Sequence, residues 1–249
     1  MKKYTRIFLC GLMGSGKSTV GRILASRLEV PFSDLDSMIE QKTGTSIAAI
    51  FESDGESRFR EIERAVLEEV LDGDRDRDRD RDRDGDGDRD MDMDRDGLKG
   101  FVMALGGGAL QSRELAAKVA GAGILIYLET SVEELVVRLQ GDQARPLLAM
   151  PDEPGVESHQ PEPKKDTEPK TKASVTVASV TVTSVDSENR MKETLQRLLH
   201  DREPLYRMAA VQVNTDGKSP EEVADVCFDV CLKELAVMKR VNGANGGDL

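Results

Sequence analysis

Short apolar runs alternate with longer amphipathic stretches along most of the chain. The apolar runs predict buried strands at residues 6–10, 31–34, 101–105, 124–128 and 211–214. The amphipathic stretches predict helices at residues 17–28, 60–71, 112–120, 132–139, 191–201 and 220–235, with a further helical stretch reaching Ile39. Apolar strands that each lead into a helix are typical of a parallel sheet covered by helices on both faces. The pattern therefore predicts an α/β fold with a helix layer on each side of a central parallel sheet.

An aspartate-rich segment interrupts this pattern at residues 72–97. Aspartate occupies every second position there, and 13 Asp with 7 Arg give the segment a net charge of −6. Such a segment can bury almost nothing, so we expect a solvated insertion without fixed structure. Two registers, from Asp80 and from Asp82, begin like an EF-hand calcium loop. Their twelfth positions are Met91 and Met93 instead of the bidentate Glu, which leaves weak cation binding at most.

A second foreign segment covers residues 149–187. It is rich in Pro, Glu and Lys and then reads SVTVASVTVTSV at residues 174–185. The alternation could pair as a strand, but it contains no larger apolar residue, and we favour a flexible linker. We therefore expect one domain over residues 1–240, interrupted at 72–97 and 149–187, with a flexible tail at 241–249.

Composition narrows the class of partner. The net charge is −12, half of it from the first insertion, and no basic stripe stands out, which argues against a nucleic-acid partner. Three cysteines have neither the number nor the spacing of a disulfide framework or zinc site, so we expect buried free thiols. No apolar run approaches the roughly 18 residues of a membrane span, and no small-residue cleavage site makes the N-terminal run a signal peptide. We expect a cytoplasmic protein.

The clearest motif follows the first predicted strand. Residues 11–18 read GLMGSGKS and match G-x-x-x-x-G-K-[ST], with Gly11, Gly14, Gly16, Lys17 and Ser18 at the expected places. In this motif backbone amides wrap the phosphates at a helix N-terminus, the lysine neutralises phosphate oxygens and the hydroxyl ligates Mg²⁺. Placed between an apolar strand and an amphipathic helix, it predicts a nucleotide-binding loop.

Other residues bear on the acceptor of the phosphoryl group. Asp34 and Asp36 end the second strand, where ligands bind in parallel sheets, although a helix N-cap is an alternative for them. Arg60 and Glu63 lie one helical turn apart, and residues 106–108 are three glycines at a strand end. Arg145, Arg202 and Arg207 add cations, and arginine suits bidentate recognition of a carboxylate. A small acid is therefore a plausible substrate.

Taken together these motifs resemble the shikimate kinase family. GLMGSGKST, FSDLDSMIE, IFESDGESRFREIE, LGGGAL, RPLL and REPLY occur in that family's order and span nearly all of residues 5–235 outside the two insertions. The resemblance implies a three-layer P-loop kinase fold with a mobile lid, and transfer of the γ-phosphoryl of ATP to the 3-hydroxyl of shikimate on the route to chorismate. It also implies Mg²⁺ as cofactor, ATP and shikimate as the bound small molecules, and a monomer.

The resemblance further implies roles for individual residues. Asp36 would hold the shikimate hydroxyls and act as the base, Lys17 and the lid residue Arg145 would stabilise the transferring phosphoryl, and Glu63 would orient Arg60. The implied shikimate-binding residues are Asp36, Arg60, Gly106, Gly107, Gly108 and Arg207. The implied nucleotide-binding residues are Gly14, Ser15, Gly16, Lys17, Ser18, Thr19, Arg138 and Arg145, and the implied Mg²⁺ residues are Ser18 and, through water, Asp34.

Two alternatives stay open from the residues alone. A related kinase of another sugar acid, such as gluconate, would keep the phosphate loop. A nucleotide-binding regulatory module without turnover would need the loss of a catalytic group, and the sequence shows none missing. A lid lengthened by the second insertion is expected to keep Arg145 functional.

Overall fold

Within residues 5–72, 100–140 and 178–244, which the computed structural model describes, five parallel strands form one sheet. They are β1 (Thr5–Cys10), β2 (Phe32–Asp34), β3 (Gly100–Ala104), β4 (Ile124–Glu129) and β5 (Val211–Asn214). Their order across the sheet is β2-β3-β1-β4-β5. The central strand β1 pairs with β3 in register from Thr5 opposite Gly100 to Leu9 opposite Ala104, and with β4 on its other side.

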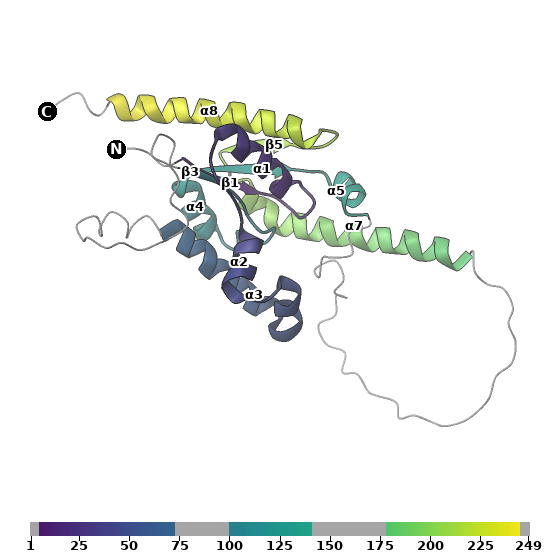
Figure 1. The fold of residues 1–249 in the computed structure, drawn as a ribbon. Helices are drawn as coiled ribbons and strands as arrows, with labels where there is room; N and C mark the ends of the chain where they lie inside the picture. The colour runs from purple at the N-terminus through teal and green to yellow at the C-terminus, as the bar shows by residue number, and fades with distance from the viewer. Residues whose placement is uncertain (1–4, 73–99, 141–177, 245–249) are drawn as a thin grey trace, which may run out of the picture.

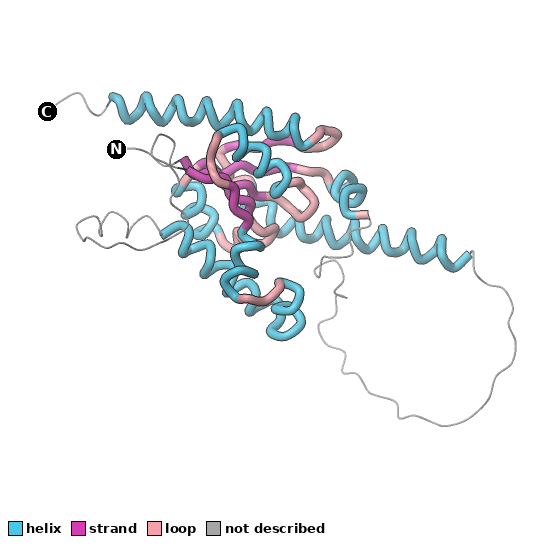
Figure 2. The backbone as a smooth tube through the Cα atoms, in the orientation of Figure 1, coloured by secondary structure: helices cyan, strands magenta, loops and turns pink. Residues whose placement is uncertain are grey.

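Helices cover both faces of this sheet. They are α1 (Lys17–Leu28), α2 (Leu35–Thr43), α3 (Ile47–Asp72), α4 (Arg113–Ala122), α5 (Val132–Leu139), α7 (Ala178–Tyr206) and α8 (Pro220–Ala244). In Figure 1, α8 runs along one side of the strands and α7 along the other, and Figure 2 separates the strand layer from the helices by colour. Helix α3 is broken at Gly55, whose φ of 77° and ψ of 176° are not helical.

The core divides at the sheet because successive residues of a strand face opposite sides. Ile7 and Leu9 of β1 pack in one cluster with residues of α1 and α8. Phe8 and Cys10 pack in a second cluster with residues of α2, α3, α4, α5 and α7. All four side chains are at most 1% exposed. Strand β1 is therefore buried on both faces, which explains why its sequence is an unbroken apolar run.

The chain leaves the neighbouring strands β1 and β3 on opposite faces of the sheet. Helix α1, which follows β1, contributes to one core cluster, and α4, which follows β3, contributes to the other. Where two adjacent parallel strands send their connections to opposite faces, a crevice opens at their carboxyl ends. Residues 11–16 after β1 and residues 105–112 after β3 border that crevice.

The predicted fold class is confirmed, and most predicted elements lie within two residues of the observed ones. Helices α1 and α5 and strand β5 have the predicted bounds. The linker expected up to residue 187 is wrong for residues 178–187, because α7 begins at Ala178. Extending an existing helix costs much less than starting one, so the packed part of α7 can continue through this weakly helical stretch. The tail prediction is likewise wrong for residues 241–244, since α8 ends at Ala244.

The cysteines behave as buried apolar residues, as predicted. Cys10, Cys227 and Cys231 are free and at most 1% exposed. Burial raises the pKa of each thiol to about 12, so all three are protonated at neutral pH. Among the residues that the structure describes, no helix is both long and apolar enough to cross a membrane.

Leu195 tests whether α7 belongs to the folded core. It lies in the middle of α7, is fully buried and packs in the second cluster. Leu195→Ala is expected to lower the free energy of unfolding by about 2–5 kcal/mol, through lost burial and a residual cavity. Chemical denaturation measures the change, with Gln196→Ala at the adjacent exposed position as the control. Similar midpoints for the two variants would mean that α7 does not pack on the sheet.

Candidate active site

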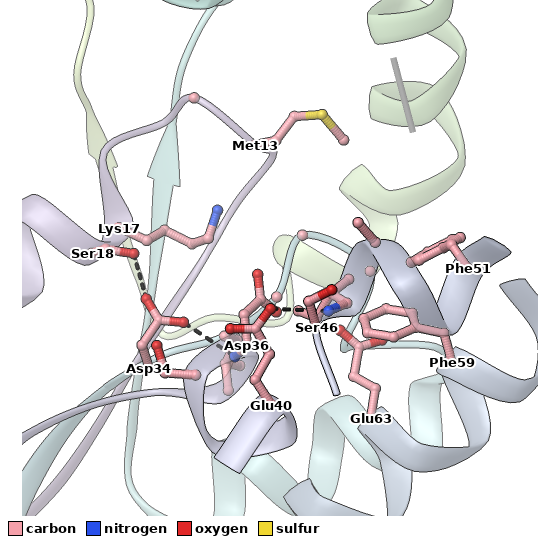
Figure 3. Close-up of a pocket in the computed structure, with 18 of the residues that line it drawn as sticks. Met13, Lys17, Ser18, Asp34, Asp36, Glu40, Ser46, Phe51, Phe59 and Glu63 are labelled. Atoms are coloured by element: carbon pink, nitrogen blue, oxygen red, sulfur yellow. Dashed lines mark hydrogen bonds between the residues drawn. The ribbon is translucent and has the colours of Figure 1, made fainter. Parts of the chain in front are cut away.

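A pocket of about 660 Å³ lies at the carboxyl ends of β1, β2 and β3. Its volume is within the range of small-molecule sites, roughly 300–1,000 Å³. The phosphate loop forms one side, and α2, α3, the triple glycine and α7 contribute the rest. Figure 3 shows several of these side chains directed into the same space.

The phosphate loop presents the positive end of α1 to the pocket. Gly16 is the N-cap of α1 and has a φ of 89°, a left-handed conformation that glycine adopts without strain. No side chain caps this helix and its first turn contains no acidic residue, so its N-terminal partial charge is not neutralised from within. Lys17 reaches back over the loop, where its Nζ donates to the carbonyl oxygens of Gly11 at 3.0 Å and Leu12 at 2.8 Å. The loop therefore concentrates amides and a cation where an anion would bind.

Asp34 links the phosphate loop to α2. The Ser18 hydroxyl donates to Asp34 Oδ2 at 2.5 Å, and Asp34 Oδ1 accepts from the Asp36 backbone N–H at 3.1 Å (Figure 3). Asp34 is thus the N-cap of α2, the alternative weighed above, and a partner of Ser18 as well. A hydroxyl and a carboxylate in contact are the hard oxygen donors that Mg²⁺ prefers.

A buried ion pair stands on the opposite side of the pocket. Arg60 Nη1 donates to Glu63 Oε2 at 2.7 Å, and the Arg60 and Glu63 side chains are 17% and 1% exposed. Arg60 Nε and Nη2 also donate to Glu56 Oε1. Burial alone would lower the pKa of Arg60, but Glu63 and Glu56 outweigh it and raise the pKa above its usual value. Arg60 is therefore always charged, and Glu63 and Glu56 bind its guanidinium at two different edges.

The three glycines allow these charged groups to approach the backbone closely. A Cβ on Gly106 would lie 2.3 Å from Glu63 Oε1 and 3.0 Å from Asp36 Oδ1. A Cβ on Gly108 would lie 2.4 Å from Arg60 Nη1. Distances of 2.3–2.4 Å are far inside van der Waals contact, so a side chain at Gly106 or Gly108 would displace the ends of the Glu63 and Arg60 side chains. Glu63 Oε1 is buried and has no hydrogen-bond partner among the described residues.

The structure brings Arg202, not Arg207, to the pocket. Arg202 lines it, and its Nη1 donates to the carbonyl of Gly107 at 3.0 Å. The Arg207 side chain is 53% exposed and pairs with Glu203 at 2.7 Å and Glu129 at 3.7 Å, outside the pocket lining. The position of Arg207 therefore does not support its predicted substrate role, and Arg202 is the candidate in its place. Arg207 stands in the turn directly after α7, five residues beyond Arg202, and five residues of helical backbone rotate a side chain by about 140°, so the two arginines point in different directions.

Arg138 marks another border of the pocket. Its Nη1 donates to Thr215 Oγ1 at 3.1 Å and its Nη2 to the Thr215 carbonyl at 2.8 Å, while Nε donates to Glu134. These bonds tie α5 to the loop after β5, next to the phosphate loop. Arg138 lines the pocket, and its predicted place beside the adenine stays a prediction.

Sequence reasoning missed the apolar wall. Phe51 and Phe59, on either side of the break in α3, line the pocket with ring centroids 4.7 Å apart, and Met13 faces it from the phosphate loop (Figure 3). Glu40 also lines it and accepts from the Ile47 N–H at the start of α3. These phenylalanines lie eight residues apart across a helix break, so a regular helical period does not bring them together.

Most predicted site residues line this one pocket. They are Gly14, Gly16, Lys17, Ser18, Thr19, Asp34, Asp36, Arg60, Glu63, Gly106, Gly107, Gly108 and Arg138. Ser15 is buried within the phosphate loop and is not among the lining residues. Arg145 and residues 73–97 of the aspartate-rich segment lie outside the described residues.

Comparison with protein families gives a match to the shikimate kinase model over residues 13–76 and 93–232. Among curated proteins, the shikimate kinase of Pseudoalteromonas translucida is 31% identical over 226 residues, covering 90% of this chain and 95% of its own. The shikimate kinase of Chlorobium luteolum is 34% identical over 217 residues, covering 87% of this chain and 80% of its own.

Solved structures give the same result. The shikimate kinase from Acinetobacter baumannii in complex with shikimate aligns with a TM-score of 0.64 and 28% identity, covering 94% of this chain and 96% of its own. The shikimate kinase from Bacteroides thetaiotaomicron aligns with a TM-score of 0.60 at 23% identity, covering 91% of this chain and 97% of its own. The second alignment supports the fold alone.

Gly106 provides a stability test of the close approach. Gly106→Ala places a methyl group against Glu63 and Asp36, so we expect the free energy of unfolding to fall by about 1–3 kcal/mol from overpacking. Gly121→Ala is the matched control, because nothing lies within 4 Å of its Cβ position in α4 and alanine favours the helix by about 0.5–1 kcal/mol. Thermal unfolding distinguishes them. A Gly106→Ala variant as stable as Gly121→Ala would contradict the close approach.

Proposed function

The chain belongs to the shikimate kinase family, and on that premise we propose how its pocket residues divide the work of phosphorylating shikimate with ATP. The reaction transfers the γ-phosphoryl group of ATP to the 3-hydroxyl of shikimate, in aromatic amino-acid biosynthesis. The observation that carries the assignment is one pocket that joins a phosphate loop to two arginines and a strand-end aspartate. Phosphoryl transfer needs mainly alignment and neutralisation of charge, and these groups supply both.

The phosphate loop holds the nucleotide. Backbone amides at the start of α1 bind the phosphates, and Lys17 exchanges its bonds to the Gly11 and Leu12 carbonyls for phosphate oxygens. The exchange is favourable because a cation binds an anionic oxygen more strongly than a neutral carbonyl. Lys17 then stabilises the negative charge that develops on the transferring group.

Ser18 and Asp34 are the residues that would hold Mg²⁺. Their oxygens are in contact at 2.5 Å beside the phosphate loop, and both are hard donors of the kind this ion selects. When bound, the ion neutralises phosphate charge. Asp34 also caps α2, so the same carboxylate sets the position of Asp36.

Arg60 and Arg202 bind the carboxylate of shikimate. They approach the triple glycine from α3 and α7, and each keeps its guanidinium in place through protein contacts, Arg60 through Glu63 and Arg202 through the Gly107 carbonyl. Arginine pairs bidentately with a carboxylate, and two cations select an acid over a neutral sugar. Arg202 thus takes the role that the sequence assigned to Arg207.

Asp36 is the group that handles the acceptor hydroxyl. Its Oδ1 lies over Gly106, in the part of the pocket between the phosphate loop and the two arginines. From there it orients the 3-hydroxyl and accepts its proton as the oxygen attacks the γ-phosphorus. Phe51 and Phe59 form an apolar wall that suits the ring of the substrate.

Two further arginines, Arg138 and Arg145, are assigned to the nucleotide. Arg138, fixed by Thr215, borders the place for the base. Arg145, which follows α5 within RPLL, is proposed on its sequence position to stabilise the phosphoryl group from the lid. A monomeric state, a cytoplasmic location and the absence of a nucleic-acid partner remain predictions from the sequence.

Turnover tests the function directly. ADP release is expected only when shikimate, ATP and Mg²⁺ are all present, and other sugar acids such as gluconate should support little of it. Turnover with gluconate in preference to shikimate, or ATP hydrolysis that does not depend on either acid, would contradict the assignment.

Asp36→Asn tests the base. It should lower kcat by roughly 10²–10⁴, because the carboxylate that accepts the proton is lost while the shape of the side chain is kept.

Arg202 in α7 and Arg207 in the turn that follows it give a matched pair of variants. Arg202→Ala should raise the KM for shikimate by about 10- to 100-fold, the loss of a charge-assisted hydrogen bond, and change the KM for ATP little. Arg207→Ala removes an arginine five residues away that pairs outside the pocket, and should leave both constants near those of the wild type. Steady-state kinetics with each substrate varied in turn measures both. The reverse ranking would restore Arg207 as the carboxylate ligand.

A further inference from the structure

One backbone oxygen in the pocket accepts two hydrogen bonds from the same helix. Arg202 Nη1 donates to the carbonyl of Gly107 at 3.0 Å, and the hydroxyl of Tyr206 donates to the same oxygen. Arg202 and Tyr206 are four residues apart, so they lie on one face of α7. A carbonyl oxygen has two lone pairs and can accept both bonds together.

The triple glycine needs such an anchor. Gly106 and Gly108 must lack side chains because Glu63, Asp36 and Arg60 come so close to them. Three successive glycines, however, have wide backbone freedom, and holding them in one conformation costs more entropy than for other residues. The peptide between Gly107 and Gly108 would therefore be loose without bonds from outside the turn. Among the described residues, both hydrogen bonds that its carbonyl accepts come from side chains of α7.

Tyr206 is well suited to supply one of them. It is 1% exposed, and its ring packs against Tyr127 with centroids 5.2 Å apart and an interplanar angle of 33°. Burial raises the pKa of its hydroxyl, which stays protonated and able to donate at any working pH. Unlike Arg202, Tyr206 does not line the pocket, so it acts from behind the turn.

We propose that Tyr206 is a positioning residue for the substrate carboxylate: its hydroxyl fixes the Gly107 carbonyl, and that carbonyl fixes the guanidinium of Arg202. The inference rests on the proposed function, in which Arg202 binds the carboxylate of shikimate. With Nη1 directed to Gly107, the other N–H groups of Arg202 are aimed from a constant position. Loss of the tyrosine hydroxyl lets the carbonyl turn and the guanidinium follow it.

Tyr206→Phe tests this role, because it removes one oxygen atom and keeps the ring. We expect kcat/KM for shikimate to fall by about three- to tenfold, the worth of one hydrogen bond, and the KM for ATP to change by less than about twofold. A loss of folded protein would lower kcat/KM for shikimate and for ATP by the same factor and leave both KM values unchanged, so comparing the two substrates separates it from the expected effect. Tyr127→Phe, which removes the hydroxyl of the neighbouring buried ring, is the matched control and should leave both constants near the wild type.

A double-mutant cycle separates positioning from packing. In an Arg202→Ala background, Tyr206→Phe is expected to change kcat/KM for shikimate by less than about twofold, because the group that it positions is gone. An equal factor in both backgrounds would show that Tyr206 acts independently of Arg202 and would overturn the proposal. So would an equal loss for shikimate and ATP, which is the result of a general packing defect.

Failure of this inference is distinct from failure of the proposed function. A wild-type protein without shikimate-dependent ADP release contradicts the function and the positioning role together. An active wild type whose Tyr206→Phe variant matches Tyr127→Phe contradicts the positioning role alone.

Discussion

The arrangement of β1 and β3 determines where the pocket lies. The two strands are neighbours that end at the same edge of the sheet, and the chain continues from them on opposite faces. The loop after β1 becomes the phosphate loop, and the loop after β3 becomes the triple glycine, so the two lie side by side over the crevice. The amides of the first loop favour an anion, and the second loop admits side chains from α2 and α3. The meeting of a donor nucleotide and an acceptor acid is therefore a consequence of strand order.

Burying charged side chains around that crevice costs free energy. The structure offsets this cost by giving each charged group a hydrogen-bonded partner. Glu63 is almost completely buried, which is tolerable because Arg60 lies 2.7 Å away. Arg60 gains two carboxylate partners on its own helix, and Arg202 gains the Gly107 carbonyl. Each cation that would meet the substrate is thus preorganised before the substrate arrives. Preorganised charge is what phosphoryl transfer requires, since little energy is then spent on reorganisation in the transition state.

The sequence predicted the sheet and the phosphate loop, and most of the site residues that it named line the one pocket, because these features depend on local patterns. Helix α1 follows from a glycine loop joined to an amphipathic period, and its observed bounds are those predicted. The motif alone did not show that Arg202 lines the pocket and Arg207 does not, because this depends on the direction of each side chain at the end of α7. The helical period of α7 could have shown which arginine faces the pocket. A spacing of four, three and four residues joins Leu195, Leu199, Arg202 and Tyr206, which places Arg202 on the buried face. The helical stretch at residues 178–187 could not be found in this way, since its β-branched residues favour a strand locally and only the packed continuation of α7 makes it helical.

The proposed function requires that a single pocket bind shikimate beside ATP. Thermal unfolding of the purified protein with shikimate alone tests it most directly, because a ligand that binds only the folded state stabilises it by about 2.7 kcal/mol at a hundredfold excess over Kd. We expect Tm to rise with shikimate concentration. In Arg202→Ala most of this rise should be lost, while the rise with nucleotide should be retained. A Tm that responds to nucleotide but not to shikimate at any concentration would contradict the proposed function.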